Sequence, residues 1–351
     1  MHKFARSLLV ALSLLSSSGA FSAGEQKIDW KMPTAFAFTW PALGDTAPWF
    51  SERLEASSSG NIVIRAYEPG KLVPPLKILE SVKNKTFEAG YTSLVYDQDK
   101  IPAGALFGSV PFGLDPMAYM AWWYDFGGSR LAEQVYAPHN IVPMLCGLTG
   151  PEGAGWFREE IKSVDQLKGL RVRYAGLGGE VLKRLGATVV PLAGNEIYPA
   201  LEKGTLDATE YSMPAIDELI GFQKILKNYY LPGWHQPYNA MHLIVNKELW
   251  DKLGASQKAA IESTCMAATM RSIARGEAAQ APALTRLKAQ GVQLRRFPAS
   301  VMQQFERKAK EVMDEKDAQD PMFRKVHENQ TVFVASYGLW KEKAYLPACS
   351  Q

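Results

Sequence analysis

Between Ile161 and Pro214 the chain reads IKSVDQLKGLRVRYAGLGGEVLKRLGATVVPLAGNEIYPALEKGTLDATEYSMP. Short apolar segments alternate in it with segments of helical character. The strand-like segments are Leu170 to Tyr174, Thr188 to Pro191 and Asp207 to Tyr211, and the helical segments are Val164 to Leu167, Gly179 to Leu185 and Ile197 to Lys203. This alternation predicts a parallel sheet with helices on its faces.

The same alternation occurs on both sides of this stretch. The further strand-like segments are Ile28 to Phe36, Asn61 to Tyr67, Ala89 to Val95, Ile141 to Leu145 and Tyr238 to Val245, with helices near Asp45 to Ala56 and Leu76 to Val82. Because the pattern begins again near residue 140, we expect two α/β domains. A length of 351 residues also exceeds what one compact core usually holds.

From Ser256 onward the chain is mostly helical. Met266, Met270 and Ile273 have the spacing of one buried helix face. Pro282 should kink or end this long helix, because proline lacks the backbone N–H that an inner turn requires.

The composition excludes several classes of protein. With 47% hydrophobic and 21% charged residues, the chain is neither disordered nor fibrous. A formal charge of +3, from 39 basic and 36 acidic residues, is too balanced to indicate nucleic-acid binding. Three cysteines, Cys146, Cys265 and Cys349, allow at most one disulfide, and the sequence does not say which pair forms it.

Residues 1–23 are interpreted as a secretory signal peptide. Lys3 and Arg6 precede the apolar run Leu8 to Leu15, and small residues follow up to Ala23. The small residues allow cleavage after Ala20 or Ser22, and the apolar run is too short to span a bilayer. We therefore expect an exported, periplasmic protein.

The sequence motifs of common enzymes are missing. The chain has no G-x-S-x-G, no G-x-x-x-x-G-K-[ST] and no H-E-x-x-H, and its five histidines lack metal-ligand spacing. The turn Gly176 to Gly179 resembles a dinucleotide-binding fingerprint, but the third glycine is replaced by Val181. A tight strand-to-helix turn is the better interpretation, and its backbone N–H groups favour an anion.

Arg173 lies at the end of the strand that precedes this turn. An arginine at the carboxyl end of a parallel strand can hold a carboxylate with two parallel hydrogen bonds. The alternative is a surface arginine in a salt bridge, and from these residues alone that alternative stays open.

Four blocks in the same order resemble the substrate-binding proteins of tripartite ATP-independent periplasmic (TRAP) transporters. They are EPGKLVPPLKILESV (Glu68 to Val82), VPFGLDPMAYMAWW (Val110 to Trp123), Gly155-Trp156-Phe157 with the stretch up to Pro214, and LKAQGVQLRRFPASV (Leu287 to Val301). The resemblance covers essentially the mature chain. It departs from the family pattern at Asn84-Lys85 and at Pro282.

The resemblance implies a periplasmic-binding-protein-like α/β fold, in which two α/β lobes enclose a ligand cleft and a long C-terminal helix crosses both. Lobe I would comprise residues 24–146 and 238–270, and lobe II residues 147–237 and 271–351. The implied function is capture of a solute by lobe closure and its delivery to TRAP membrane subunits. The resemblance also places Arg173 on the arginine that binds the ligand carboxylate, and a homodimer is a further possibility.

GNEIYPALEKGTLDATEY (Gly194 to Tyr211) and YYLPGW (Tyr229 to Trp234) are similar to the subgroup that binds 2-oxo acids with a cation. In that subgroup the metal ligands would correspond to Glu152, Glu210, Gln236 and the backbone oxygen of Tyr211. Glu152 and Gln236 stand where the subgroup has Gln and Glu, so amide and carboxylate have exchanged places. Oxygen ligands of this kind suit Na⁺ or Ca²⁺ bridging the ligand, and both remain open.

Aromatic residues would complete the pocket. Tyr96 corresponds to a ligand-facing tyrosine of the subgroup, and Trp40 lies in a loop that approaches the cleft. His235 stands where the subgroup often has an aromatic residue, so the ligand need not be pyruvate. We expect a small monocarboxylate, a 2-oxo or 2-hydroxy acid, and no enzymatic activity. The alternatives are a secreted lyase or dehydrogenase using the same cleft, and a receptor that presents the ligand to a sensor.

Overall fold

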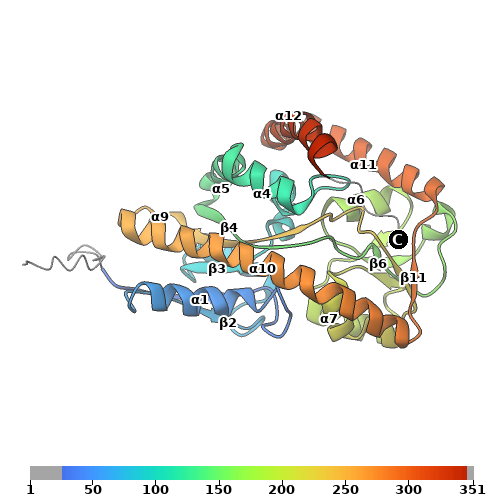
Figure 1. Cartoon of the computed structure of the whole chain (residues 1–351), viewed down its shortest axis with the longest axis horizontal. Helices are drawn as coiled ribbons and strands as arrows, with labels where there is room; N and C mark the ends of the chain where they lie inside the picture. Colours follow the sequence, from blue (N-terminus) through green and yellow to red (C-terminus); the bar gives the residue numbers. More distant parts are fainter. Residues whose placement is uncertain (1–25, 346–351) are drawn as a thin grey trace, which may run out of the picture.

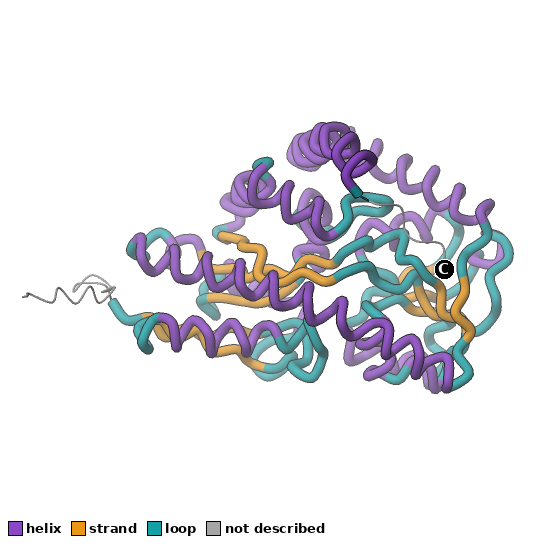
Figure 2. Tube along the Cα trace, in the orientation of Figure 1, coloured by secondary structure: helices purple, strands orange, loops and turns teal. Residues whose placement is uncertain are grey.

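The computed structural model describes residues 26–345, and its strands form two groups flanked by helices (Figures 1 and 2). The predicted signal peptide and Cys349 lie outside the described residues. Within the described part of the chain no helix is both long and apolar enough to cross a membrane.

The first group of strands contains both parallel and antiparallel pairs. β1 (Ile28–Pro33) pairs with β2 (Ile62–Tyr67) in parallel. β10 (Asn239–Asn246) lies between β3 (Ala89–Thr92) and β4 (Ile141–Thr149) and is antiparallel to both. A bridge between Thr34 and Tyr91 extends β1 toward β3.

The second group is a six-stranded sheet in the order β11-β9-β5-β8-β6-β7. Its strands are β5 (Gly155–Phe157), β6 (Arg171–Arg173), β7 (Thr188–Val189), β8 (Ala208–Thr209), β9 (Asn228–Tyr230) and β11 (Gln293–Arg295). The prediction of a parallel sheet holds for β6, β7 and β8, but β5 is antiparallel to β8 and β9. An all-parallel sheet is therefore wrong for both groups. Neighbouring strands usually become parallel when a crossover helix connects them. β5 and β10 instead adjoin the segments that cross between the two groups, and no crossover helix precedes either of them.

Helices cover both groups of strands. They are α1 (Thr46–Ser57), α2 (Ile78–Lys83), α3 (Ala105–Gly108), α4 (Pro116–Asp125), α5 (Gly128–Tyr136), α6 (Gly176–Arg184), α7 (Gly194–Glu202), α8 (Pro214–Ile220), α9 (Lys247–Trp250), α10 (Ala255–Ala289), α11 (Ala299–Gln319) and α12 (Pro321–Ala344). The predicted segment Val164–Leu167 is a short 3₁₀ helix. The apolar α1 residues Phe50 and Leu54 are fully buried, as expected for a helix that packs on β2.

The helix α10 spans 35 residues and runs along both groups of strands (Figure 1). It continues through Pro282, so the expectation that this proline could end the helix is wrong. Pro282 and Ala278, whose carbonyl loses its hydrogen bond, are both exposed, and water can satisfy that carbonyl.

The buried face of α10 differs from the one predicted. Met266 and Met270 are 50% and 57% exposed, and the buried face carries mainly small residues, among them Ala268 and Ser272. The Leu148 backbone N–H of β4 donates to Ser272 Oγ at 2.8 Å, and Ser272 Oγ donates to the Leu148 carbonyl at 3.0 Å. Small side chains allow this close approach, which methionines would prevent.

One disulfide joins Cys146 of β4 to Cys265 of α10. It links β4 to the long helix beside it.

The C-terminal helix α12 returns to the helices of the first half of the chain. Trp122 Nε1 donates to Asn329 Oδ1 at 2.7 Å, and Gln330 Nε2 donates to the Leu106 carbonyl at 2.9 Å. The predicted lobe II includes α12, whereas these contacts join α12 to residues of the predicted lobe I. The boundaries of the two lobes stay a prediction.

Candidate functional site

Arg173 and Glu210 stand at the carboxyl ends of neighbouring parallel strands. Arg173 ends β6 and is paired with Thr209 of β8, so Glu210 follows directly beside it. The Glu210 N–H donates to the Arg173 carbonyl at 3.0 Å. The carboxyl ends of parallel strands form one edge of a sheet, which is where α/β proteins place ligands.

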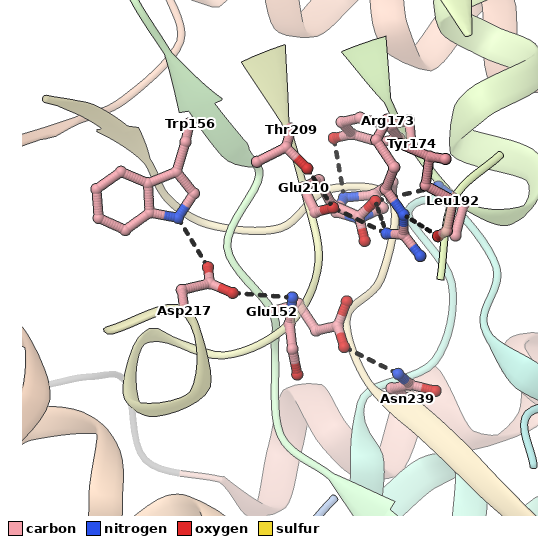
Figure 3. A network of polar contacts seen from close by, with 12 residues as sticks. Glu152, Trp156, Arg173, Tyr174, Leu192, Thr209, Glu210, Asp217 and Asn239 are labelled. Carbon is pink, nitrogen blue, oxygen red and sulfur yellow. Dashed lines mark hydrogen bonds and ion pairs between the residues drawn. The ribbon is translucent and has the colours of Figure 1, made fainter. Parts of the chain in front are cut away.

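The Arg173 side chain is buried, with 3% of its surface exposed. Nη1 donates to the Glu210 carbonyl at 2.8 Å and to Glu210 Oε2 at 3.2 Å, and Nε donates to the Leu192 carbonyl at 3.2 Å (Figure 3). Its guanidinium lies 5.0 Å from the centre of the Tyr211 ring. Burial is the largest single effect and disfavours the charge, but Glu210, Tyr96, Tyr211 and Glu152 together outweigh it and raise the pKa of Arg173. The exposed salt bridge belongs instead to Arg171, which binds Asp207 at 2.6 Å.

The Glu210 carboxylate occupies the N-terminus of α6. Its Oε2 accepts a hydrogen bond from the Ala175 N–H at 3.1 Å. The turn after β6 therefore offers its N–H to an anion, as the sequence predicts, and this anion is a side chain of the protein. Burial raises the pKa of Glu210, but Arg173, His235 and the Ala175 N–H together lower it below its ordinary value.

Glu152 and Gln236 come from the two segments that connect the groups of strands. Glu152 lies between β4 and β5, Gln236 lies between β9 and β10, and the Glu152 N–H donates to the Gln236 carbonyl at 3.1 Å. Gly233 makes this approach possible, since a Cβ there would lie 2.4 Å from the Glu152 carbonyl oxygen. Asn239, the first residue of β10, donates from Nδ2 to Glu152 Oε1 at 2.9 Å (Figure 3).

Glu152 differs from Glu210 in its protonation. Burial and the repulsion of Glu210 raise the pKa of Glu152 well above its ordinary value, and the hydrogen bond from Asn239 offsets only part of this. The carboxyl group of Glu152 therefore gives up its proton less readily than that of Glu210, and a cation close to it would favour the charged form.

The Gln236 amide lies between the two acids. Its terminal atom is 2.9 Å from Glu152 Oε2, 3.0 Å from Glu210 Oε1 and 3.1 Å from His235 Nε2. An amide nitrogen in this place donates to both carboxylates, and rotation of the amide by about 180° places its oxygen there instead. Two carboxylate oxygens and an amide oxygen make a donor set that fits a hard cation.

His235 belongs to the same cluster. Its side chain is 1% exposed, and its ring offers a nitrogen that lies within 4.8 Å of carboxylate oxygens of Glu152 and Glu210. From the sequence, His235 was expected in the pocket and not among the metal ligands. A histidine with no partner at metal-ligand spacing in the sequence carries no signal for such a role.

Tyr96 and Tyr211 lie close to Arg173, and Trp40 packs against Tyr211. The Trp40 and Tyr211 rings meet edge to face at 5.2 Å, and Arg173 and Tyr96 line a cavity of about 90 Å³. Burial raises the pKa of Tyr96 to about 12, so its hydroxyl keeps its proton. The structure thus places all the predicted site residues around Arg173 and Glu210.

Two further polar residues were not predicted. Asn239 holds Glu152, as described above. Asp217 is buried in α8 and accepts from Trp156 Nε1 at 2.8 Å and from the Ser212 N–H at 3.2 Å (Figure 3). Burial raises the pKa of Asp217 to about 8. A polar residue at the start of a strand or helix is common, so neither position was distinctive in the sequence.

The profile of the bacterial extracellular solute-binding proteins, family 7 (DctP), matches residues 41–320. The chain belongs to this family. Its members are substrate-binding receptors of TRAP transporters and not enzymes, so the expected family and the absence of enzymatic function are confirmed, and the alternative of a secreted enzyme is not supported.

Three similar proteins span nearly the whole chain. A monocarboxylate 2-oxoacid-binding periplasmic protein from Nostoc sp. is 35% identical over 93% of this chain and 89% of its own length. A TRAP solute-binding protein from Bordetella bronchiseptica, a dimer with calcium and picolinate, has a TM-score of 0.89 at 32% identity, covering 91% and 95% of the two chains. One from Pseudoalteromonas atlantica with sodium and pyruvate has a TM-score of 0.87 at 29% identity, covering 91% and 97%. The predicted fold, two α/β lobes with a long helix across them, is confirmed.

Proposed function

We propose that this TRAP solute-binding protein captures a small monocarboxylate, a 2-oxo or 2-hydroxy acid, together with a cation. In this proposal Arg173 binds the ligand carboxylate, and Glu152, Glu210, Gln236 and the Tyr211 carbonyl hold the cation. The observation that carries the proposal is the convergence of two buried carboxylates and one amide beside a buried arginine.

The charges of the cluster support a cation. Two ionised carboxylates and an anionic ligand carry three negative charges, and Arg173 balances one of them. A buried negative charge without a partner costs several kcal/mol. A cation between Glu152 and Glu210 would supply the missing positive charge and keep Glu152 ionised. The Na⁺ and Ca²⁺ of the related structures are both suited to oxygen ligands.

The space beside Arg173 supports a small ligand. The cavity of about 90 Å³ is small, which suits a molecule of a few heavy atoms. Arg173 uses Nε and Nη1 for protein carbonyls and Glu210, which leaves Nη2 for a ligand carboxylate. Tyr96 and Trp40 would close the pocket from the first group of strands.

The proposed route follows from the family. Residues 1–23 would direct export to the periplasm, lobe closure would trap the ligand, and TRAP membrane subunits would receive it. A homodimer, as in the Bordetella relative, is part of the proposal.

Calorimetry on the mature protein, stripped of metal and ligand, tests this function with pyruvate and lactate as probes in Na⁺, Ca²⁺ or choline buffer. We expect binding that requires one of the two metal cations, with the acid recovered unchanged. Native mass spectrometry of the same sample reports the bound ion and the number of protomers. Absence of binding to either acid with any cation would contradict the proposal.

A further inference from the structure

The buried imidazole of His235 has a fixed orientation in the cation cluster. Tyr174 Oη donates its single hydrogen to the Ala154 carbonyl at 2.9 Å, and His235 Nδ1 lies 3.1 Å from the same oxygen. The hydroxyl therefore accepts, and Nδ1 carries the donated hydrogen. In the neutral ring this leaves a lone pair on Nε2; only the charged ring has a hydrogen there to donate to Glu210.

That lone pair is directed into the cluster. Nε2 lies 3.5 Å from Glu210 Oε1 and 3.1 Å from the end of the Gln236 amide. An imidazole lone pair and a carboxylate oxygen repel each other unless a proton, an amide N–H or a metal ion lies between them. The second nitrogen of a metal-bound histidine typically donates to an oxygen, as Nδ1 does here to Tyr174.

The surroundings of the ring allow little movement. The Tyr174 and Trp234 rings lie 4.5 Å and 5.6 Å from it, centre to centre. On another side is Gly178 of α6, where an added Cβ would come within 2.6 Å of the His235 Cβ. Preorganisation of this kind strengthens metal binding because little side-chain freedom is lost.

We propose that His235 Nε2 is a direct metal ligand and that the site prefers a divalent transition cation such as Zn²⁺ to Na⁺ or Ca²⁺. This inference rests on the cation site of the proposed function and specifies which class of metal ion binds there. Ca²⁺ takes six to eight oxygen ligands, whereas imidazole nitrogen suits Zn²⁺, Ni²⁺ or Cu²⁺. Glu152, Glu210, Gln236 and His235 supply three oxygens and one nitrogen, to which the Tyr211 carbonyl of the proposed site would add a fourth oxygen, and Zn²⁺ accepts mixed donors of this kind. A bound 2-oxo acid would add its own oxygens to the same ion.

The test compares metal binding by the wild type with that of three variants, all as metal-free mature protein without added acid. His235→Phe removes the nitrogen and keeps an aromatic ring, and Tyr174→Phe removes the hydroxyl that orients it. His139→Gln, in the segment before β4 and outside the cluster, is the control. Competition calorimetry measures Zn²⁺ and Ca²⁺, and pulsed electron paramagnetic resonance of the Cu²⁺-loaded protein detects a coordinated imidazole.

We expect the wild type to bind Zn²⁺ at least about 100-fold more tightly than Ca²⁺ and to show the imidazole signal. His235→Phe should lose the signal and most of the preference, because its Zn²⁺ affinity should fall much more than its Ca²⁺ affinity. Tyr174→Phe should weaken Zn²⁺ binding by about tenfold, as expected for a positioning residue. The His139→Gln control should match the wild type.

A wild type without imidazole signal, or with a Zn²⁺ preference that survives in His235→Phe, overturns the proposal. The signal in the wild type decides the question even if His235→Phe does not fold. Pyruvate binding with Na⁺ or Ca²⁺ is measured separately, so the proposed function can stand when this inference fails. Conversely, Zn²⁺ held by His235 in a protein that binds no acid would leave the inference intact.

Discussion

The segments after β4 and β8 each place one glutamate in the same site, and the two glutamates behave in opposite ways. Glu152 and Glu210 are equally buried, at 0% and 1% exposure. Glu210 has Arg173, His235 and the Ala175 N–H beside it, and its pKa is lowered, whereas Glu152 has the amide of Asn239, and its pKa is raised. Because the burial of the two acids is the same, their neighbouring charges decide the direction of each pKa shift.

Replacing each glutamate by glutamine should change the free energy of unfolding by very different amounts. Glu210→Gln leaves the buried Arg173 without its ionic partner and should lower the free energy of unfolding of the metal-free protein by about 3 to 5 kcal/mol. Glu152→Gln replaces a carboxyl group whose pKa is raised by burial and by Glu210, and it should cost less than about 1 kcal/mol. Urea unfolding at pH 7 measures both. Equal losses would show that the two acids are ionised alike.

The second prediction concerns the positive charge of Arg173. Arg173→Ala should weaken pyruvate binding by about 3 kcal/mol, about 100-fold, because it removes a charged contact in a closed cleft. The matched control is Arg171→Ala on the same strand, whose exposed ion pair should matter little to binding. In calorimetry, an affinity of Arg173→Ala within about tenfold of the wild type would end its role as the carboxylate ligand.

Asp217 extends the comparison to a third buried acid. Its pKa is raised to about 8 in the folded protein, whereas an unfolded aspartate titrates near ~4. Between these values the folded state holds a proton that the unfolded state has released. The free energy of unfolding should therefore fall as the pH rises from about 5 to 8, by at most ~1.4 kcal/mol per pH unit from this group. Thermal unfolding across that range should show a weaker dependence in Asp217→Asn, and an unchanged slope would exclude Asp217 as its source.

The smallest expected effect concerns the hydrogen bond that Glu152 receives. Asn239→Ala removes the donor to Glu152 Oε1 and should make the carboxylate harder to ionise. Cation-dependent pyruvate binding should weaken by about 1 kcal/mol, roughly fivefold. Calorimetry at fixed Ca²⁺ measures this, and Asn239→Asp, which adds a repelling charge, should be worse than alanine. If alanine binds as well as the wild type, Asn239 does not support Glu152.

Much of the fold was predictable from local patterns. The segments from Leu170 to Tyr211 alternate as predicted because strand and helix periodicities are local properties of the chain. The strand positions and the four ordered sequence blocks were sufficient to recognise the family. Strand direction in β5 and β10 was not predictable, because pairing depends on which distant strand a segment meets. The buried face of α10 also depended on its partner, since Met266 and Met270 have the spacing of a core face and yet are exposed.

The residue types of the site were present in the sequence, and their roles came from contacts between distant segments. Arg173 and Glu210 could be paired in advance, since both follow parallel strands. The orientation of the His235 ring could not be predicted, because it depends on Tyr174, 61 residues away in the chain, and on the carbonyl of Ala154. The opposite pKa shifts of Glu152 and Glu210 likewise depend on distances through space. The energy of an electrostatic interaction depends on the distance between the charges, and groups far apart in the sequence reach these short distances only when the chain has folded.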